Sequence, residues 1–365
     1  MTRPLRKNTR PPSIRDVAAA AGVSYQTVSR VLNDSPNVNP GTRRHVRDVI
    51  DQMDYRPNRA ARALGLGRTG AITVLTTDTM RYGYASTLQG VEEAARQNGL
   101  AVGVRVVESD RSADIRQAVD YVSDPTAGSV VVIAFDSAGA AVVRALPPTI
   151  PVVAATEAGG LPGTSRSMIY LDERPAAAQA TEHLLALGHR TVHHVAIPSE
   201  TGTSARQAGW REALREAGAP VPRVLRAGWD PHSAYLAGRR LAADAAVTAI
   251  FCGNDDTALA VRRALHEAGR DVPAEVSLVG LDDVPGAAYW TPALTTVRMD
   301  FVGLGRACVA ELIGAGTPAP FAPPRLVVRE STAVPRHVPG SGAGLRAAGR
   351  TTPRPSPGRL SRSSR

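Results

Sequence analysis

From Ala71 onward the chain alternates short apolar runs with amphipathic helical stretches, and few folds accommodate that alternation. The runs AITVLTT, LAVGVRVV, SVVVIAF, PVVAAT, VHHVAI, AIFCG and VSLVGLDD are rich in Val and Ile, which predicts strands buried inside parallel sheets. Between them lie helical stretches such as STLQGVEEAARQNG, AAAQATEHLLALG, ARQAGWREALREAG and DTALAVRRALHEAG, several of which end in Gly, a common helix stop. We therefore expect an α/β body of about 265 residues, and two doubly wound lobes are favoured over one large sheet.

The segment before this body predicts three short helices. Ser13 and Asp16 have the spacing of a capping box, and apolar residues then recur on one helical face until Gly22. Ser24 is expected to cap the second helix. The third helix opens near NPGTRR and stops before Pro57, whose ring disfavours helix in the preceding residue. A Gly turn between the first two helices is typical of a helix-turn-helix unit.

Positive charge is concentrated at the two ends of the chain. The whole sequence carries a formal charge of +10, of which residues 1–68 contribute +8 and residues 336–365 contribute +7, while the middle contributes −5. A basic head suits a polyanion partner, although charge alone is equally consistent with an ordinary soluble surface. The Pro-, Gly-, Ser- and Arg-rich tail is expected to be disordered.

Metal binding, cofactor binding and catalysis find little support in the sequence. Cys252 and Cys308 lie far apart without metal-ligand spacing, and strand alternation sends His193 and His194 to opposite faces, so no metal and no cofactor is expected. The sequence contains no GxSxG, P-loop or HExxH motif, and GLGRTG precedes a strand where a dinucleotide fingerprint would follow one. With neither a signal segment nor a membrane span, we expect a cytoplasmic, nucleoid-associated protein that is not an enzyme.

The segment SIRDVAAAAGVSYQTVSRVLNDSPNVNPGTRRHVRDVIDQMDYRPNRAARAL resembles the DNA-binding head of the LacI/GalR family of bacterial repressors. The blocks EHLLALGHR, SARQAGWREAL, GNDDTALA, DVPAEVSLVGLDD and PALTTVRMD resemble successive family blocks in the same order, so the resemblance covers about residues 13–335. It implies a helix-turn-helix domain (13–56), a hinge helix and linker (57–68) and a two-lobed, periplasmic-binding-protein-like body (69–335) for effector binding and dimerisation, with disordered ends at 1–12 and 336–365.

A recognition helix presents its N-terminal side chains to base edges in the major groove. Because Gln pairs with adenine and Arg with guanine, we expect Tyr25, Gln26 and Arg30 to read bases; the alternative is an ordinary solvated helix face. Phosphate contacts, which set register, are expected from Ser24, Thr27, Ser29, Asn33, Thr42 and Arg43.

The hinge helix is the second DNA element that the resemblance implies. Its residues Asn58, Ala61 and Leu64 would enter the minor groove, where an apolar wedge unstacks a base step and bends the duplex. An isolated helix of this length is marginal in water, so the segment would fold only when supported. A plain linker into the body is the alternative.

For the body, the resemblance implies a small effector, a sugar or glycoside, held between the lobes by Arg206, Asn254 and Asp282. These residues suit a polyol because Arg donates hydrogen bonds, Asp accepts them and Asn does both; a structural ion pair is the alternative for Arg206 and Asp282. Trp229 would pack on a sugar face or else belong to the core.

Two weaker effector candidates are Phe301 and Asp172, which can equally pack or cap a helix. The sequence also departs from the family pattern: Pro175 stands where a sugar-contacting Asp is expected, and Met299 where a polar residue is expected. The pocket is therefore expected to differ in detail from those of its relatives.

The resulting expectation is a homodimeric repressor that holds a palindromic double-stranded DNA operator and releases it when the effector binds. The tail lacks the Leu heptads through which tetramers form, and a two-fold dimer suits a palindrome. A corepressor-dependent regulator of the same family is the main alternative. A sugar-binding transport protein and an α/β enzyme are the alternatives from other classes.

Overall fold

The computed structural model describes residues 12–32, 34–56, 70–157, 160–161, 163–199, 204–315 and 321–336. The expectations for the two chain ends, for Asn33 and for the hinge residues Asn58, Ala61 and Leu64 lie outside these residues. Among the helices described, none is both long and apolar enough to span a membrane.

The head consists of three helices, as its periodicity predicts. The capping box before the first helix is present: the Asp16 backbone N–H donates to Ser13 Oγ at 3.3 Å, and the Ser13 N–H donates to the Asp16 carboxylate at 2.7 Å. Val17, Val28 and Val46, one from each helix, are fully buried and form a small core of their own. The helices are α1 (Ile14–Ala20), α2 (Tyr25–Leu32) and α3 (Pro40–Gln52).

Gly22 and Ser24 shape the turn between α1 and α2. Gly22 has φ of +60°, a left-handed conformation that costs glycine little. Two residues later, Ser24 Oγ accepts the Thr27 N–H at 3.1 Å, which caps α2 as predicted.

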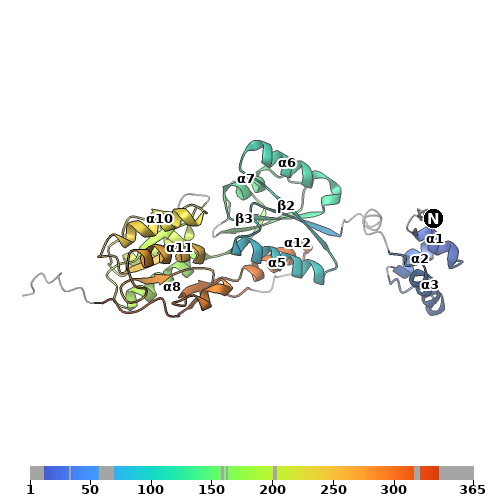
Figure 1. Cartoon of the computed structure of the whole chain (residues 1–365). Coiled ribbons are helices and arrows are strands. Elements are labelled where there is room, and N and C mark those ends of the chain that lie inside the picture. Colours follow the sequence, from blue (N-terminus) through green and yellow to red (C-terminus); the bar gives the residue numbers. More distant parts are fainter. Residues whose placement is uncertain are drawn as a thin grey trace, which may run out of the picture.

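The first lobe of the body is a five-stranded parallel sheet with the order β2-β1-β3-β4-β5. Helices α5 and α12 cover one face and α6 and α7 the other (Figure 1). Its elements are β1 (Ala71–Thr76), α5 (Tyr82–Gln97), β2 (Ala101–Val106), α6 (Ser112–Ser123), β3 (Ser129–Ala134), α7 (Ser137–Ala145), β4 (Val152–Glu157), β5 (Ser167–Leu171) and α12 (Phe301–Ile313).

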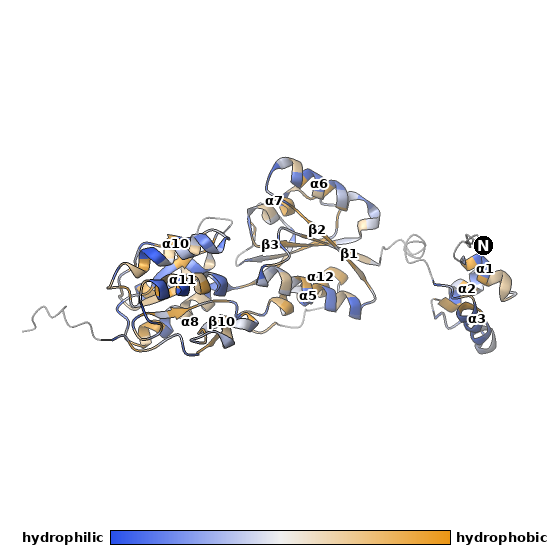
Figure 2. Cartoon of the chain, in the orientation of Figure 1, coloured by the Kyte–Doolittle hydropathy of each residue, from blue (hydrophilic) through white to orange (hydrophobic). Residues whose placement is uncertain are grey.

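Side chains along each central strand alternate between these two helical layers. Ile72 and Val74 of β1 pack toward α5 and α12, whereas Leu75 packs toward α6 and α7. Figure 2 shows hydrophobic colour on the central strands and mixed colour along the surrounding helices. Because both faces are covered, the strands read as continuous apolar runs, and the expectation of a doubly wound sheet is confirmed.

The prediction that strand β2 is buried was wrong. This strand lies at the edge of the sheet and pairs only with β1, and Val104 and Val106 remain 47% and 45% exposed. An apolar run cannot distinguish a central strand from an edge strand, because position in the sheet depends on chain crossovers and not on local composition.

The second lobe repeats the same design with a four-stranded parallel sheet in the order β7-β6-β8-β9. Helices α8 and α9 pack on one face, with α10 and α11 on the other. The elements are α8 (Glu173–Ala186), β6 (His193–Ala196), α9 (Ala205–Glu216), β7 (Leu225–Arg226), α10 (Pro231–Ala242), β8 (Ala249–Cys252), α11 (Asp255–Glu267) and β9 (Ser277–Val279).

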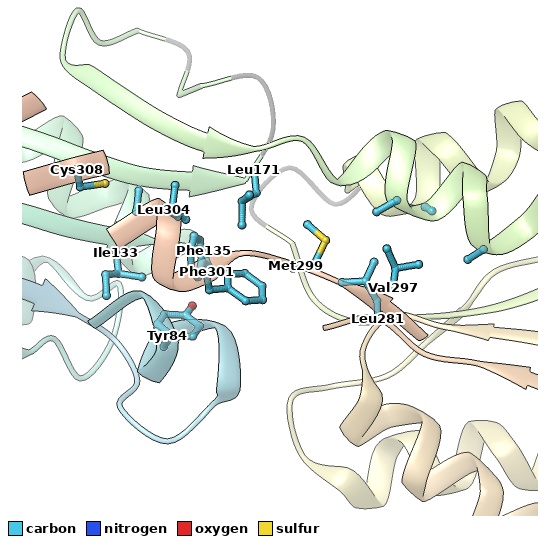
Figure 3. Packing of buried hydrophobic residues seen from close by; sticks show 14 of the residues in the cluster. Tyr84, Ile133, Phe135, Leu171, Leu281, Val297, Met299, Phe301, Leu304 and Cys308 are labelled. Atoms are coloured by element: carbon cyan, nitrogen blue, oxygen red, sulfur yellow. The ribbon is translucent and has the colours of Figure 1, made fainter. Parts of the chain in front are cut away.

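The chain crosses between the lobes near the carboxyl ends of their strands. It leaves the first lobe after β5, returns to it through β10 (Thr296–Arg298) into α12, and comes back to pair β11 (Arg325–Val327) with β10. Figure 3 shows Met299 between Phe301 of the first lobe and Leu281 and Val297 of the second. Ligands of doubly wound sheets bind at such carboxyl ends, beside the point where strand order reverses.

Close helix packing beside these crossings depends on glycine. A Cβ on Gly209 of α9 would lie 2.1 Å from the Arg174 carbonyl oxygen of α8. A Cβ on Gly90 of α5 would lie 2.0 Å from the Val302 carbonyl oxygen of α12. Each pair of helices therefore approaches as closely as the backbone allows.

Candidate DNA-binding and effector sites

Helix α2 separates a core face from a free face. Val28 and Val31 are buried, while Gln26 and Arg30 are exposed and Tyr25 is 53% exposed. Among the described residues, no ion pair or hydrogen bond ties down the Gln26 or Arg30 side chain. A short helix with one buried side and long, unoccupied donors and acceptors on the other can enter a DNA groove without losing its own packing.

A shallow hollow of about 340 Å³ lies beside this free face. It collects three of the expected phosphate contacts, Ser24, Thr27 and Thr42, together with Arg30. Backbone N–H groups at helix N-termini suit a phosphate oxygen, and both α2 and α3 begin here. The residues lining the hollow are Val23, Ser24, Thr27, Arg30, Asn37, Val38, Asn39 and Thr42.

Asn37 and Asn39 are members of this hollow that sequence reasoning missed. Asn39 Oδ1 accepts the Gly41 N–H at 2.8 Å and caps α3. An Asn directly before Pro is a recognisable helix start, so Asn39 carried a usable signal. Asn37 carried none.

Arg43 and Ser29, which are also expected to contact phosphates, do not line this hollow. The Arg43 guanidinium donates to Asp34 Oδ1 at 3.3 Å and to the Ser35 carbonyl at 2.5 Å, so it holds the loop between α2 and α3. Ser29 is half-buried and does not line the hollow. Asp34 has φ of +50°, a conformation that local sequence patterns did not reveal.

In the body, the expected effector residue Arg206 is a buried side chain on the first turn of α9. Its Nη1 donates to the Gly253 carbonyl at 2.6 Å and its Nη2 to Glu173 Oε1 at 2.5 Å. Burial disfavours the guanidinium charge, but Glu173, Asp282 and Glu157 outweigh it and raise the pKa of Arg206 above its ordinary value. The ion pair considered for Arg206 exists, although its partner is Glu173 and not Asp282.

Glu173 was not foreseen as a site residue. It is the first residue of α8, is 3% exposed, and follows the expected contact Asp172. Asp172 itself is exposed and caps α8 by accepting the Arg174 N–H at 3.1 Å. An acidic residue in the first helical turn at the end of a strand was the available signal, but it equally fits a simple interaction with the helix dipole.

Asp282 lies just beyond β9 in a strained conformation. Its φ is +114°, which L-residues rarely adopt, and such strain concentrates at functional sites. Burial raises the pKa of Asp282 well above its usual range, although the Arg206 charge opposes this. The neighbouring carboxylate, Asp283, is instead paired with Arg298 and Arg329, each at 2.6 Å.

The remaining expected effector residues frame the same region. Asn254 Oδ1 accepts the Thr257 N–H at 2.9 Å and caps α11. Trp229 is half-buried and is not part of a core cluster; the Arg81 guanidinium of the first lobe lies 4.4 Å from its ring centre. Phe301 packs against Tyr82 and Phe135 with ring centres 6.1 Å apart in both cases.

Three buried polar atoms in this region have no hydrogen-bond partner among the described residues: Glu173 Oε2, Arg206 Nε and Asp282 Oδ1. Buried polar groups are nearly always paired, so unpaired ones need an explanation. Two acceptors and one donor match a molecule with neighbouring hydroxyl groups. The Pro175 side chain has no polar atom with which to replace the sugar-contacting Asp expected at its position. Met299, which is 4% exposed, is part of the apolar core.

Known proteins resemble this chain over most of its length. Residues 13–58 match the family described as bacterial regulatory proteins, lacI family, and residues 181–332 match a periplasmic binding protein-like domain. The lactose operon repressor of Escherichia coli (strain K12) is 30% identical over 307 residues, which cover 83% of this chain and 84% of the repressor.

Solved structures agree with that relationship. The lac repressor dimer bound to operator and the anti-inducer ONPF superposes with a TM-score of 0.78 at 28% identity. The match covers 89% of this chain and 100% of that chain. The transcriptional regulator CelR in complex with cellobiose superposes with a TM-score of 0.63 at 28% identity, covering 88% and 99%.

Proposed function

This chain belongs to the LacI family of bacterial regulatory proteins, and from that membership we propose that it represses transcription as a dimer on a palindromic operator and is released by a small sugar or glycoside. It is a DNA-binding transcriptional regulator. We further propose the operator geometry, the class of effector and the roles of individual residues.

The free face of α2 carries the proposal. Tyr25, Gln26 and Arg30 project from a helix whose other side closes the head core, so they can meet base edges in the major groove. The hollow beside them, with Ser24, Thr27 and other polar side chains at two helix starts, suits the phosphates that set register. The proposed hinge contacts Asn58, Ala61 and Leu64 would add a minor-groove element.

The effector proposal rests on the unpaired polar atoms of Glu173, Arg206 and Asp282. These residues come from the second lobe, while Arg81 of the first lobe reaches Trp229 across from it. A ligand bound to these residues that also reaches Arg81 would contact both lobes, so its affinity would depend on how the lobes are arranged. It releases the operator only if it prefers the lobe arrangement that holds DNA poorly.

The dimer proposal is supported by strand β2. Val104 and Val106 are 47% and 45% exposed on an unpaired sheet edge, and exposed apolar edges favour association with another chain. A second copy of this chain would also present a second recognition helix, as a palindrome requires.

The first test is binding of the purified protein to a lac-type palindrome, its single half-site and random DNA at one salt concentration. Specific binding is expected to exceed random binding by about 10³ or more, and one sugar among a panel should weaken it. An Arg30→Ala variant should lose preference at one base pair, whereas Arg15→Ala, which changes an exposed residue of α1, should not. A preference below about tenfold would contradict the base-reading roles.

A further inference from the structure

The effector site contains one element that binding a polyol does not by itself require: the buried ion pair between Glu173 and Arg206. The two side chains are 4% and 7% exposed, and their closest atoms are 2.5 Å apart. Removing two charges from water is costly, so the pair is not there merely to fill space. With a neutral side chain in place of Glu173, the Arg206 guanidinium could bind an anionic group of a ligand, as arginines in ligand sites commonly do. We propose that Glu173 determines effector specificity by occupying Arg206, which excludes effectors with a phosphate or carboxylate group.

The Arg206 guanidinium already carries two hydrogen bonds within the protein. Arginine binds carboxylates and phosphates through two parallel hydrogen bonds from neighbouring nitrogens. In this chain one Nη donates to Glu173 and the other to the Gly253 carbonyl. Nε has no partner among the described residues and each Nη uses only one of its two N–H groups, so donors remain on the guanidinium. The attraction for a second anion is removed instead by the Glu173 carboxylate, which already balances the guanidinium charge.

The other arginines nearby are also paired with carboxylates. Arg298 and Arg329 are both paired with Asp283. Arg81 lies 3.4 Å from the Asp78 carboxylate while its guanidinium covers the Trp229 ring. Every arginine that this region contributes among the described residues therefore has a carboxylate partner.

Several acidic side chains lie around Arg206 and Asp282. Asp282 has an unpaired oxygen, and Glu157 acts on Arg206 in the same way as Glu173 and Asp282 do. Asp255 and Asp256 add further negative potential at Asp282. A ligand anion beside Arg206 would meet the negative potential of Glu173 and Glu157, and like charges across an interface are strongly unfavourable.

The paired arginines and the surrounding acids predict a ranking of ligands by charge. A sugar with an ammonium group binds at least as tightly as its neutral parent, because Asp282 accepts from either. The corresponding uronate or 6-phosphate binds at least about tenfold more weakly, owing to like-charge repulsion. This inference rests on the effector site proposed above and narrows the chemistry of its ligand.

The ranking is tested on the unmodified, full-length protein by calorimetric titration of matched sets. One set is galactose, galactosamine, galacturonate and galactose 6-phosphate, and the other is the corresponding glucose set. In whichever set binds, the neutral and amino members are expected to bind at least about tenfold more tightly than both anions. An anionic member that binds as tightly as its neutral parent overturns the proposal.

The role of Glu173 itself is tested with Glu173→Gln, which keeps the side-chain shape and removes the charge. The ratio of neutral to anion affinity is expected to fall by about tenfold, because Arg206 is then free to meet the anion. Glu212→Gln is the matched control, since Glu212 pairs with Arg174 on the exposed surface of the same two helices. An unchanged ratio in Glu173→Gln, or an equal change in Glu212→Gln, contradicts the proposal.

Inorganic phosphate provides a probe that needs no known effector. All three tryptophans, Trp210, Trp229 and Trp290, lie in the body, so their fluorescence follows body unfolding without the head. Phosphate stabilises folded proteins in general relative to chloride, so the expected result is that it raises the melting temperature of Glu173→Gln more than that of the unmodified protein at equal ionic strength. Equal responses of the two proteins overturn the proposal. If Glu173→Gln does not fold, Glu173→Asp should keep the ranking of the unmodified protein.

Operator binding measured on the same samples separates the two failures. A protein that prefers the palindrome but binds anionic sugars best retains the proposed function and loses this inference. A protein that follows the charge ranking without any preference for the palindrome keeps the inference and loses the DNA-reading roles.

Discussion

The residues proposed to read DNA in the head and those proposed to bind an effector in the body have opposite surroundings. In the head, Tyr25, Gln26 and Arg30 sit on the outside of one helix and take no part in its core. In the body, Glu173, Arg206 and Asp282 come from separate elements and are nearly inaccessible to water. A surface site can change without affecting the fold, whereas a buried charged site is part of what holds the fold together.

The largest effect is expected from breaking the buried pair. Arg206→Met leaves the Glu173 carboxylate buried without a cation, which should lower the free energy of unfolding by about 3–5 kcal/mol. Urea unfolding followed by tryptophan fluorescence measures this for the body alone. Arg174→Met is the control because its pair with Glu212 is half-exposed and should contribute at most about 1 kcal/mol. Similar losses for the two variants would remove the distinction between buried and surface charges.

A second effect concerns acid. His194 is buried between Phe251 and Trp210, and burial lowers its pKa from 6.5 to about 4. Between these pH values the unfolded chain binds a proton that the folded chain does not, so stability falls as the pH falls from 6.5 toward 4.

His194→Phe removes this titration, so the pH profile of unfolding free energy should flatten by about 3 kcal/mol over that range. His266→Phe, at an exposed position on α11, serves as the control. Parallel profiles for His194→Phe and the unmodified protein would show that this ring does not set the acid sensitivity of the body.

A third test asks whether helix packing holds the effector site in register. Gly209→Ala places a methyl group against the Arg174 carbonyl and should cost about 1–3 kcal/mol by forcing α8 and α9 apart. Arg206 lies on the same helix as Gly209, so effector affinity should fall as well. Gly103→Ala has open space around it and should leave both quantities unchanged. Loss of stability with unchanged affinity would separate packing from the site.

The smallest effect on the fold is expected in the head. Arg30→Ala should weaken operator binding by about 1–3 kcal/mol and change the free energy of unfolding by less than about 0.5 kcal/mol. Gel-shift titration and thermal melting measure the two quantities. If Arg30→Ala instead destabilised the head while sparing operator binding, the helix face would be structural and the contrast with the body would fail.

The same contrast explains how far sequence reasoning reached. The three head helices, the Ser13 capping box and most strands of the first lobe follow from periodicity and caps, which are properties of neighbouring residues. Strand β5 was not predicted; it lies at the other edge of the sheet, and most of its residues are only partly buried, with Tyr170 46% exposed. Arg206 and Asp282 were named as site residues, but the partner of Arg206 was not.

What the sequence alone determined is the three head helices, the alternation of most strands with helices in the body, the two faces of α2 and the polar residues available where strands end. These features depend on contacts within a few residues, so they are written in local patterns. The tertiary structure decided that β2 lies at an edge, that Arg206 pairs with Glu173 across 33 residues and with Gly253 across 47, and that atoms of Glu173 and Asp282 remain unpaired. These outcomes depend on which elements, distant in sequence, pack together. Because burial removes water, each polar atom there either finds a partner on a neighbouring element or stays unpaired.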